Sequence, residues 1–461
     1  MTPALSDREL RALGRTEGDA HALGLLVHDQ DTRRFLLLRA LFDAADQAPD
    51  AVCPPALRHR LRDDWALLEA AERADRAAAR SVLLHPLVGP WGRRCLSGLG
   101  AGATTPQLLA DMAHFGAIAA AAAIRARMPF TIRLTVRGST LPLPTLGALR
   151  TGRGQVDLSH ADGVLAVRSE GGTDIVVRPV TDGRHPHDPR WRPVHVLPPL
   201  VPGAAPVPLD DFDPHRTADG GPGAHGLSGA VRLDDRARAG WAESWAGVAD
   251  RLRAGGGHRL TEAAVLLRCL VPLAPPPGSG RTGGSASHCS GTRREAFGAV
   301  LSSRPGTSGY FASTLVHELQ HTKLAALTAL VPLHHEGPEA RHFAPWRPDP
   351  RPFDGLLQGA VSHAALAGYW QRCALAAESA GERDLAWTEH ARCHEQVGAV
   401  LPVLAGSGGL TREGRVVVNE LISLYHRLAE SPAPTGHQAR ARAYVGTARV
   451  IWQQRNGSGQ L

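Results

Sequence analysis

The sequence predicts an α+β protein that is mainly helical, in which a zincin-like pair of metal-binding helices is accompanied by a short sheet. Three observations lead to this prediction. Long stretches near both ends carry Ala, Leu and Arg at helical spacing, and a middle region alternates like strands. Two histidines, His317 and His321, lie four residues apart inside an apolar run. The 461 residues, 43% of them hydrophobic, are enough for more than one buried core.

The patterns divide the chain into four predicted regions. Residues 1–127 are a helical N-terminal region with few β-branched residues, and residues 128–200 are a β-rich region with strand-like runs such as Phe130–Val136. Residues 201–228 are rich in Pro and Gly and predict a linker. Residues 229–461 are predicted to form an HExxH metal-binding catalytic domain.

Within the catalytic region the expected order is a helix, two strands and then the motif helix. A helix is expected over residues 233–254, and buried strands over 263–273 and 295–303. The motif helix is expected to begin near Ser308 and to end before Pro332, and a second helix begins at Phe353. Three further helical stretches complete the C-terminal part.

The segment Leu315–Leu324 reads LVHELQHTKL and contains the HExxH motif. On a helix, His317 and His321 lie about 40° apart and can both reach one metal ion, with Glu318 beside the open coordination positions. Short HExxH matches also arise by chance in a chain with 23 histidines. Lys323, the only lysine, lies about 240° from His317 around the helix, which favours a structural ion pair over a catalytic role.

Two histidines need at least one further protein ligand, and His363 is the best candidate. It follows His321 by 42 residues, and it lies on an apolar, small-residue face with Gly359 and Ala360, where another element can approach. Polar rivals occupy a stretch that is predicted to be an exposed loop: His334, His335, Glu336, Glu339 and His342.

A proline-rich segment, APWRPDPRP at residues 344–352, lies between the two predicted ligand helices. Its prolines favour an extended path, and it carries Arg347 and Arg351. A guanidinium group matches a carboxylate, so these arginines are candidates for binding an organic acid or a peptide. The structural alternative is that they bind Asp349, Asp354 or helix-end carbonyls.

A second metal motif, HxD, occurs at residues 160–162 but is better explained by a turn. Asp162 and Gly163 stand between two strand-like runs, as in a β-hairpin. The histidines of His185-Pro186-His187-Asp188 fall in a proline-rich connection and receive the same interpretation.

Composition restricts the remaining functional classes. The net charge of +7 comes from arginines that are scattered and not gathered into a stripe, which argues against a nucleic-acid partner. No signal peptide and no run of 18 apolar residues is evident, so a soluble, cytoplasmic protein without a membrane partner is expected. The six cysteines show no CxxC spacing and predict buried thiols.

Taken together, LVHELQHTKL, the following LVPL, the APWRPDPRP segment and GLLQGA before His363 resemble a known family. They are similar to the HExxH-motif peptide-modification proteins of actinobacterial ribosomal-peptide clusters, which accompany or are fused to radical-SAM maturases. The resemblance is strongest over residues 295–370 and includes Lys323. It implies an iron(II)- and 2-oxoglutarate-dependent dioxygenase that hydroxylates the β-carbon of a precursor-peptide residue.

The ligands alone leave three interpretations open. In a hydroxylase, His317, His321 and His363 hold iron(II), Arg351 or Arg347 holds the distal carboxylate of 2-oxoglutarate, and Glu318 faces substrate. In a zinc metallopeptidase, Glu318 is the general base. A peptide-binding scaffold needs neither Glu318 nor the arginines. A strand at residues 297–302 could pair with an extended peptide in either enzyme.

Overall fold

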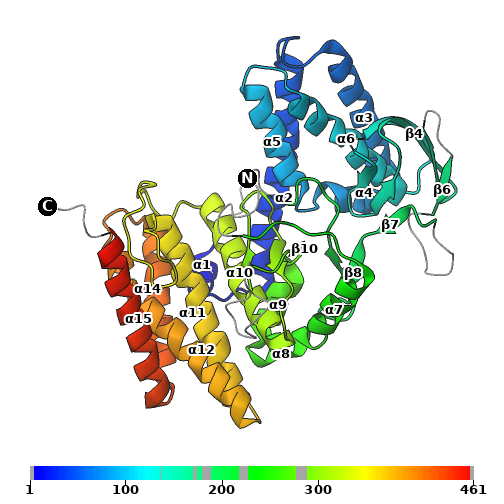
Figure 1. The fold of residues 1–461 in the computed structure, drawn as a ribbon. Helices are drawn as coiled ribbons and strands as arrows, with labels where there is room; N and C mark the ends of the chain where they lie inside the picture. The colour runs from blue at the N-terminus through cyan, green and yellow to red at the C-terminus, as the bar shows by residue number, and fades with distance from the viewer. Residues whose placement is uncertain are drawn as a thin grey trace.

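The computed structural model describes residues 5–136, 138–169, 174–178, 188–217, 227–276 and 288–456. Within them the protein is mostly helical and has three small sheets, which confirms the predicted class (Figure 1). The helices are α1 Asp7–Gly14, α2 Ala20–Gln47, α3 Pro55–Ala74, α4 Arg76–Leu83, α5 Val88–Gly100, α6 Pro106–Arg125, α7 Asp235–Trp245, α8 Val248–Ala254, α9 Gly257–Leu266, α10 Ser308–Leu330, α11 Phe353–Ala376, α12 Ala380–Gly398, α13 Leu401–Gly406, α14 Arg412–Ala429 and α15 Thr435–Asn456. The strands are β1 Phe130–Val136, β2 Thr140–Leu143, β3 Gly147–Arg150, β4 Gly154–Ala161, β5 Val164–Ser169, β6 Ile175–Val177, β7 Trp191–Pro193, β8 His195–Leu197, β9 Val207–Leu209, β10 Cys269–Leu273, β11 Ser290–Gly291 and β12 Ala299–Ser303.

Helix α2 joins two hydrophobic cores. Leu23 and Leu26 lie in the larger core with the C-terminal helices, whereas Leu38 and Leu41 lie in a second core with α3 to α6 and the first strands. Figure 1 shows this long helix running from one lobe into the other. The predicted helical region 1–127 therefore contributes to both cores, and its first helices pack with the predicted catalytic domain.

The second core contains the predicted β-rich region. The strands β1, β4, β5 and β6 form an antiparallel sheet, and α6 packs against β1. The predicted turn after His160 is observed: Asp162 and Gly163 have φ values of 51° and 73°, and the Nδ1 atom of His160 donates to the carbonyl of Met128 at 2.7 Å. His185, Pro186 and His187 lie outside the described residues.

Helix α6 is the one described helix whose length and apolar composition would suffice to cross a membrane. In this fold 72% of the most apolar 18-residue stretch of α6 is buried, and the helix packs against α3, α4 and α5. A core helix passes the same test of length and composition.

A mixed five-stranded sheet with the order β11-β12-β10-β9-β8 lies beneath the motif helix. Strand β10 is parallel to both β9 and β12. The linker prediction is wrong for Val207–Leu209, because these residues form β9 and pair with the neighbouring strands. The predicted strand 263–273 is also too long: its first part is the end of α9, and β10 begins at Cys269.

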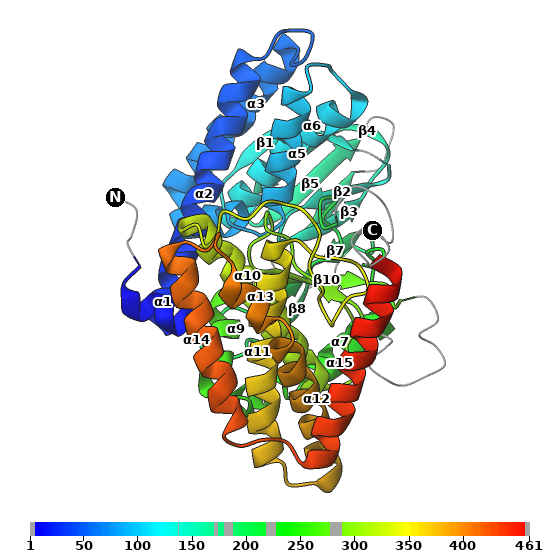
Figure 2. The same cartoon turned by 90° about the vertical axis from the view of Figure 1, so that its left-hand side faces the viewer.

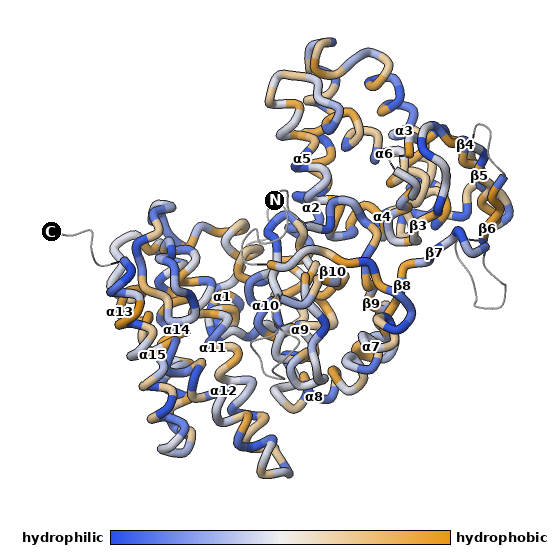
Figure 3. The backbone as a smooth tube through the Cα atoms, viewed as in Figure 1, coloured by the Kyte–Doolittle hydropathy of each residue, from blue (hydrophilic) through white to orange (hydrophobic). Residues whose placement is uncertain are grey.

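The predicted ends of the motif helix are confirmed by α10. The hydroxyl of Thr307 accepts from the backbone N–H of Tyr310 at 3.3 Å, and the helix ends at Leu330, two residues before Pro332. Helix α11 packs along α10, and α12 and α14 pack on α11 (Figure 2). In Figure 3 the hydrophobic colour is concentrated near interior strands such as β10, whereas α12 and α15 carry much hydrophilic colour.

Lys323 fixes the outer side of α10. Its ammonium group forms a buried ion pair with Glu262 of α9, and it also donates to the carbonyls of Thr16 at 2.9 Å and Glu17 at 3.2 Å. Arg259 pairs with the same carboxylate. The predicted structural role of Lys323 is confirmed: the ion pair joins the motif helix to α9, and the two hydrogen bonds join it to the connection between α1 and α2.

Candidate metal centre

Helix α10 places the two motif histidines side by side. The Nε2 atoms of His317 and His321 are 3.1 Å apart. Two nitrogens that bind one ion at about 2.0–2.1 Å are separated by about 3.0–3.4 Å, so this spacing fits a shared metal. The Nδ1 atom of His321 faces the side-chain oxygen of Gln358 at 3.3 Å, an arrangement that leaves its Nε2 lone pair free for an ion.

The predicted third ligand, His363, lies beside this pair on α11. Its ring centroid is 5.3 Å from that of His317, and its Nδ1 atom donates to the carbonyl of Gly359 at 2.8 Å. No choice of one nitrogen from each ring brings all three histidines within 4.8 Å of one another. The structure thus brings the three side chains together, and His363 must turn toward the pair to complete a ligand set.

The proline-rich segment packs against His363. The indole ring of Trp346 stacks on the His363 ring with centroids 4.5 Å apart and an interplanar angle of 18°. A Cβ atom at Gly359 would lie 2.2 Å from the indole Cζ2 atom. The close approach of Trp346 explains why position 359, on the small-residue face of α11, is Gly.

The electrostatic surroundings keep these imidazoles neutral. Burial lowers the pKa of His317, His321 and His363, in the last case to about 3. The charge of Arg392 lowers the pKa of His317 and His363 further. Neutral imidazole is the form that binds metal, so the site is prepared for a cation near neutral pH.

Glu318 is buried beside the histidines and has no cationic partner among the described residues. The Ser290 hydroxyl donates to its Oε1 atom at 2.7 Å, while Oε2 has no hydrogen-bond partner. Burial raises the pKa of Glu318 to about 7. A carboxyl group in this state can either accept or hold a proton near neutral pH.

The two predicted arginines both contact Asp349, as the structural alternative expects, but they differ in position. Arg347 donates to Asp349 at 2.9 Å, and Arg351 does so at 3.3 Å. The Nε atom of Arg351 is buried without a partner, and its charge lowers the pKa of His321. Arg351 is therefore the arginine with free donor capacity next to the metal ligands.

The histidines open into a cavity of about 990 Å³ with a strong excess of positive charge. Three acidic residues line it, Glu295, Glu318 and Asp354, against eight arginines. The arginines are Arg33, Arg34, Arg93, Arg293, Arg294, Arg347, Arg351 and Arg392. Such a cavity favours an anionic ligand.

Sequence reasoning missed two polar residues of this cavity, Arg392 and Gln396, one turn apart on α12. The Arg392 Nε atom and the Gln396 Oε1 atom are buried without partners. Their spacing places them on one helix face, but no sequence signal links that face to the motif. Only the packing of α12 on α11 brings them to the site.

The strand expected to pair with a peptide, residues 297–302, is partly covered. Strand β12 lies between β11 and β10, and β11 pairs with its residues Leu301 and Ser302. The edge of the sheet beside the cavity is β11, whose residues Ser290 and Gly291 line it. An added peptide strand would extend the sheet at this edge by pairing with β11.

The loop rivals of His363 lie away from the pair. His334 is 3.6 Å from Asp354, and Glu336 pairs with Arg341. His342 forms an isolated bridge with Arg351. None of the predicted rivals lines the cavity: His334, His335, Glu336, Glu339 and His342.

Comparison of the sequence with protein-family models and with curated proteins found no match. The geometry of the site therefore carries the functional argument.

Proposed function

We propose that the protein is an iron(II)- and 2-oxoglutarate-dependent hydroxylase that acts on a side-chain β-carbon of a ribosomally synthesised precursor peptide. The observation that carries the proposal is that the rings of His321 and His363 lie 4.7 Å and 5.3 Å from that of His317, centroid to centroid, at an arginine-rich cavity. The paired helices α10 and α11 would then be a zincin-like ligand pair. The sequence resemblance described above points to the same activity.

The donor set fits a divalent iron ion. His317, His321 and His363 would hold it, each through a neutral imidazole, and three protein ligands leave room for further ligands on an octahedral ion. Gln358 and the carbonyl of Gly359 accept from the Nδ1 atoms of His321 and His363 and fix their tautomers. When bound, iron(II) and 2-oxoglutarate supply the activation of dioxygen that hydroxylation of an unactivated carbon requires.

The chain itself would bind and orient the reactants. Arg351, with its free Nε atom, would receive the distal carboxylate of 2-oxoglutarate, Arg347 would stand beside it, and Arg392 would add positive charge from α12. Glu318 would remain a substrate-facing group held by Ser290. The buried apolar flanks of α10 would exclude bulk water from the reacting atoms.

The substrate in this proposal is a precursor peptide that adds to the β11 edge and extends into the cavity. A radical-SAM maturase from the same cluster is the proposed partner, and the cytoplasm is the proposed location.

A zinc metallopeptidase is the second candidate because one observation favours it. Glu318 is buried, lies next to His317, and its pKa is raised to about 7, which suits a general base that activates water. Under that alternative the arginines would bind peptide carboxylates. The two candidates require different cofactors and give different products.

The test is turnover of the peptide encoded beside the gene. The full chain is loaded anaerobically with iron(II) and given 2-oxoglutarate, oxygen and peptide, and the peptide mass is followed. The proposal predicts a gain of one oxygen atom that disappears without 2-oxoglutarate or in His363→Ala, whereas His342→Ala, a nearby histidine outside the cavity, retains activity. Peptide fragments formed with zinc and without 2-oxoglutarate would instead establish the peptidase.

A further inference from the structure

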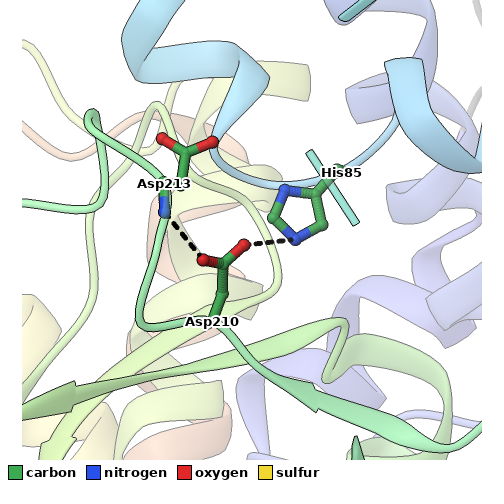
Figure 4. Close-up of side chains that lie close together, drawn as sticks. All are labelled: His85, Asp210 and Asp213. Atoms are coloured by element: carbon green, nitrogen blue, oxygen red, sulfur yellow. Dashed lines mark hydrogen bonds and ion pairs between the residues drawn. The ribbon is translucent and has the colours of Figure 1, made fainter. Parts of the chain in front are cut away.

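A second cluster of metal-binding residue types, His85, Asp210 and Asp213, lies outside the residues that line the cavity (Figure 4). His85 lies in the connection between α4 and α5, and Asp210 and Asp213 lie in the loop that follows β9. One ligand atom from each residue lies within 4.8 Å of the others, and within the described ranges this is the one group of three such side chains that does so. The three residues are 5%, 2% and 4% exposed.

The buried imidazole of His85, which has no hydrogen-bond partner, points to a bound ligand. Both of its ring nitrogens are buried and have no hydrogen-bond partner, and Nε2 faces the Asp210 Oδ2 atom at 3.6 Å. Figure 4 shows the ring directed at the two carboxylates. Burying an imidazole without a hydrogen-bond partner is unfavourable, so a fold that keeps one is expected to supply it with a partner.

The charge of Arg216 acts on both carboxylates, but its guanidinium donates to the backbone carbonyl of Asp213 and not to either carboxylate. In the described part of the chain, no arginine or lysine forms an ion pair with Asp210 or Asp213. Asp210 Oδ1 accepts from the backbone N–H groups of Phe212 and Asp213, and Asp213 Oδ1 accepts from that of His215. Those bonds hold the loop, and they leave Asp210 Oδ2 directed toward His85.

We propose that His85, Asp210 and Asp213 bind a divalent cation of the zinc class that fastens the two lobes together. Zinc binds imidazole nitrogens and carboxylate oxygens. A bound ion would give the imidazole of His85 a partner and would neutralise the two carboxylates. The position explains a structural role, because the backbone N–H of Asp210 donates to Leu270 of β10 and the carbonyl of His85 accepts from Arg34 of α2. The ion would therefore join the connection after α4 to the central sheet.

Zinc binding to the full chain tests the proposal once the candidate metal centre at His317 and His321 has been removed by substitution. In the background His317→Ala/His321→Ala, metal is stripped with a chelator, zinc is titrated, and bound zinc is measured by elemental analysis together with the melting temperature. We expect one tightly bound zinc per chain and a rise in melting temperature. A background variant that binds no zinc would overturn the proposal.

Adding His85→Gln to that background identifies the site. We expect zinc affinity to fall by about a hundredfold or more and the zinc-dependent rise in melting temperature to vanish, since even the loss of a residue that supports a ligand costs about 10–100-fold. His390→Gln is the matched control, because His390 is equally buried but bonds to the carbonyl of Ala367, and it must keep the zinc. Unchanged zinc affinity in His85→Gln would contradict the assignment.

Asp213→Asn keeps the test valid if His85→Gln fails to fold. The amide oxygen of Asn can still accept from the N–H of His215, so the loop is preserved while the negative charge is lost. A folded chain, judged by circular dichroism, is expected to lose the zinc. Retention of tightly bound zinc by this variant would again overturn the proposal.

Discussion

Trp346 stacks on the ring of His363 with centroids 4.5 Å apart and an interplanar angle of 18°. The indole ring approaches α11 so closely that position 359 accepts only Gly. The proline-rich segment therefore orients the third histidine, and it does so by packing. This relationship connects the two motifs that stand apart in the sequence.

Gly359→Ala is expected to displace Trp346 and loosen His363. The added Cβ atom would lie 2.2 Å from the indole, so the variant should lose about 1–3 kcal/mol of stability and bind metal about 10-fold more weakly. Thermal unfolding and metal titration measure the two effects. Gly368→Ala, on the same helix with its nearest neighbour at 3.8 Å, should keep both properties; equal losses in the two variants would refute the packing argument.

Arg351→Ala should weaken 2-oxoglutarate binding far more than Arg347→Ala. Arg351 has a buried, unpartnered Nε atom next to the ligands, and a charge-assisted bond is worth about 1.5–3 kcal/mol. The expected change is a KM for 2-oxoglutarate raised about 10- to 100-fold, with a smaller change for Arg347→Ala. Steady-state kinetics at fixed peptide concentration decide this, and an equal effect of the two substitutions would mean that the co-substrate binds elsewhere.

Glu318→Gln separates the two candidate enzymes. Removal of a general base lowers turnover by about 10²–10⁴-fold, whereas a substrate-facing side chain that keeps its shape should cost less than about 10-fold. The amide can still accept from the Ser290 hydroxyl, so the local fold is retained. Peptide turnover by Glu318→Gln is the measurement, and near-complete loss would favour the peptidase.

Lys323→Met should destabilise the protein by about 1–3 kcal/mol, because it breaks the buried ion pair with Glu262 and leaves the carbonyls of Thr16 and Glu17 without their donor, while Arg259 still pairs with the carboxylate. Chemical denaturation measures the loss. The double variant Lys323→Met/Glu262→Gln should lose less stability than the sum of the two single variants, since Glu262→Gln alone leaves two buried cations, Lys323 and Arg259, without their carboxylate. If the double variant is as unstable as the sum of the two single variants, the ion pair is not the cause.

Asp64 makes stability depend on pH. Burial raises its pKa from about 3.8 to about 7, so the folded state holds a proton that the unfolded state has lost between these values. The contribution of Asp64 to the free energy of unfolding is fully present below its pKa in the unfolded chain, about 3.8. This contribution is lost as the pH rises through its pKa in the folded protein, about 7. Asp64→Asn should therefore stabilise the protein at pH 8 by on the order of 1–3 kcal/mol and have no effect near pH 3.5, as measured by unfolding at both pH values. A benefit that did not depend on pH would contradict this explanation.

The sequence allowed the motif helix to be predicted almost to the residue, because its cap at Thr307, its apolar flanks and Pro332 are local signals. The small-residue face of α11 correctly indicated a close neighbour, although nothing local identified it as Trp346. Strand β9 was missed because three residues in a Pro/Gly-rich stretch carry no periodicity, and they become a strand by pairing with β10. Arg392 reaches the cavity through tertiary packing, which no sequence pattern encodes.

The most direct test of the account is to supply heavy-isotope dioxygen to the iron-loaded full chain with 2-oxoglutarate and the precursor peptide. Mass spectrometry then follows the origin of any oxygen that the peptide gains, and succinate is measured in the same sample. The account predicts one labelled oxygen atom per modified peptide, one succinate for each, and loss of both in His363→Ala. Incorporation of oxygen from water, or cleavage of the peptide without consumption of 2-oxoglutarate, would contradict it.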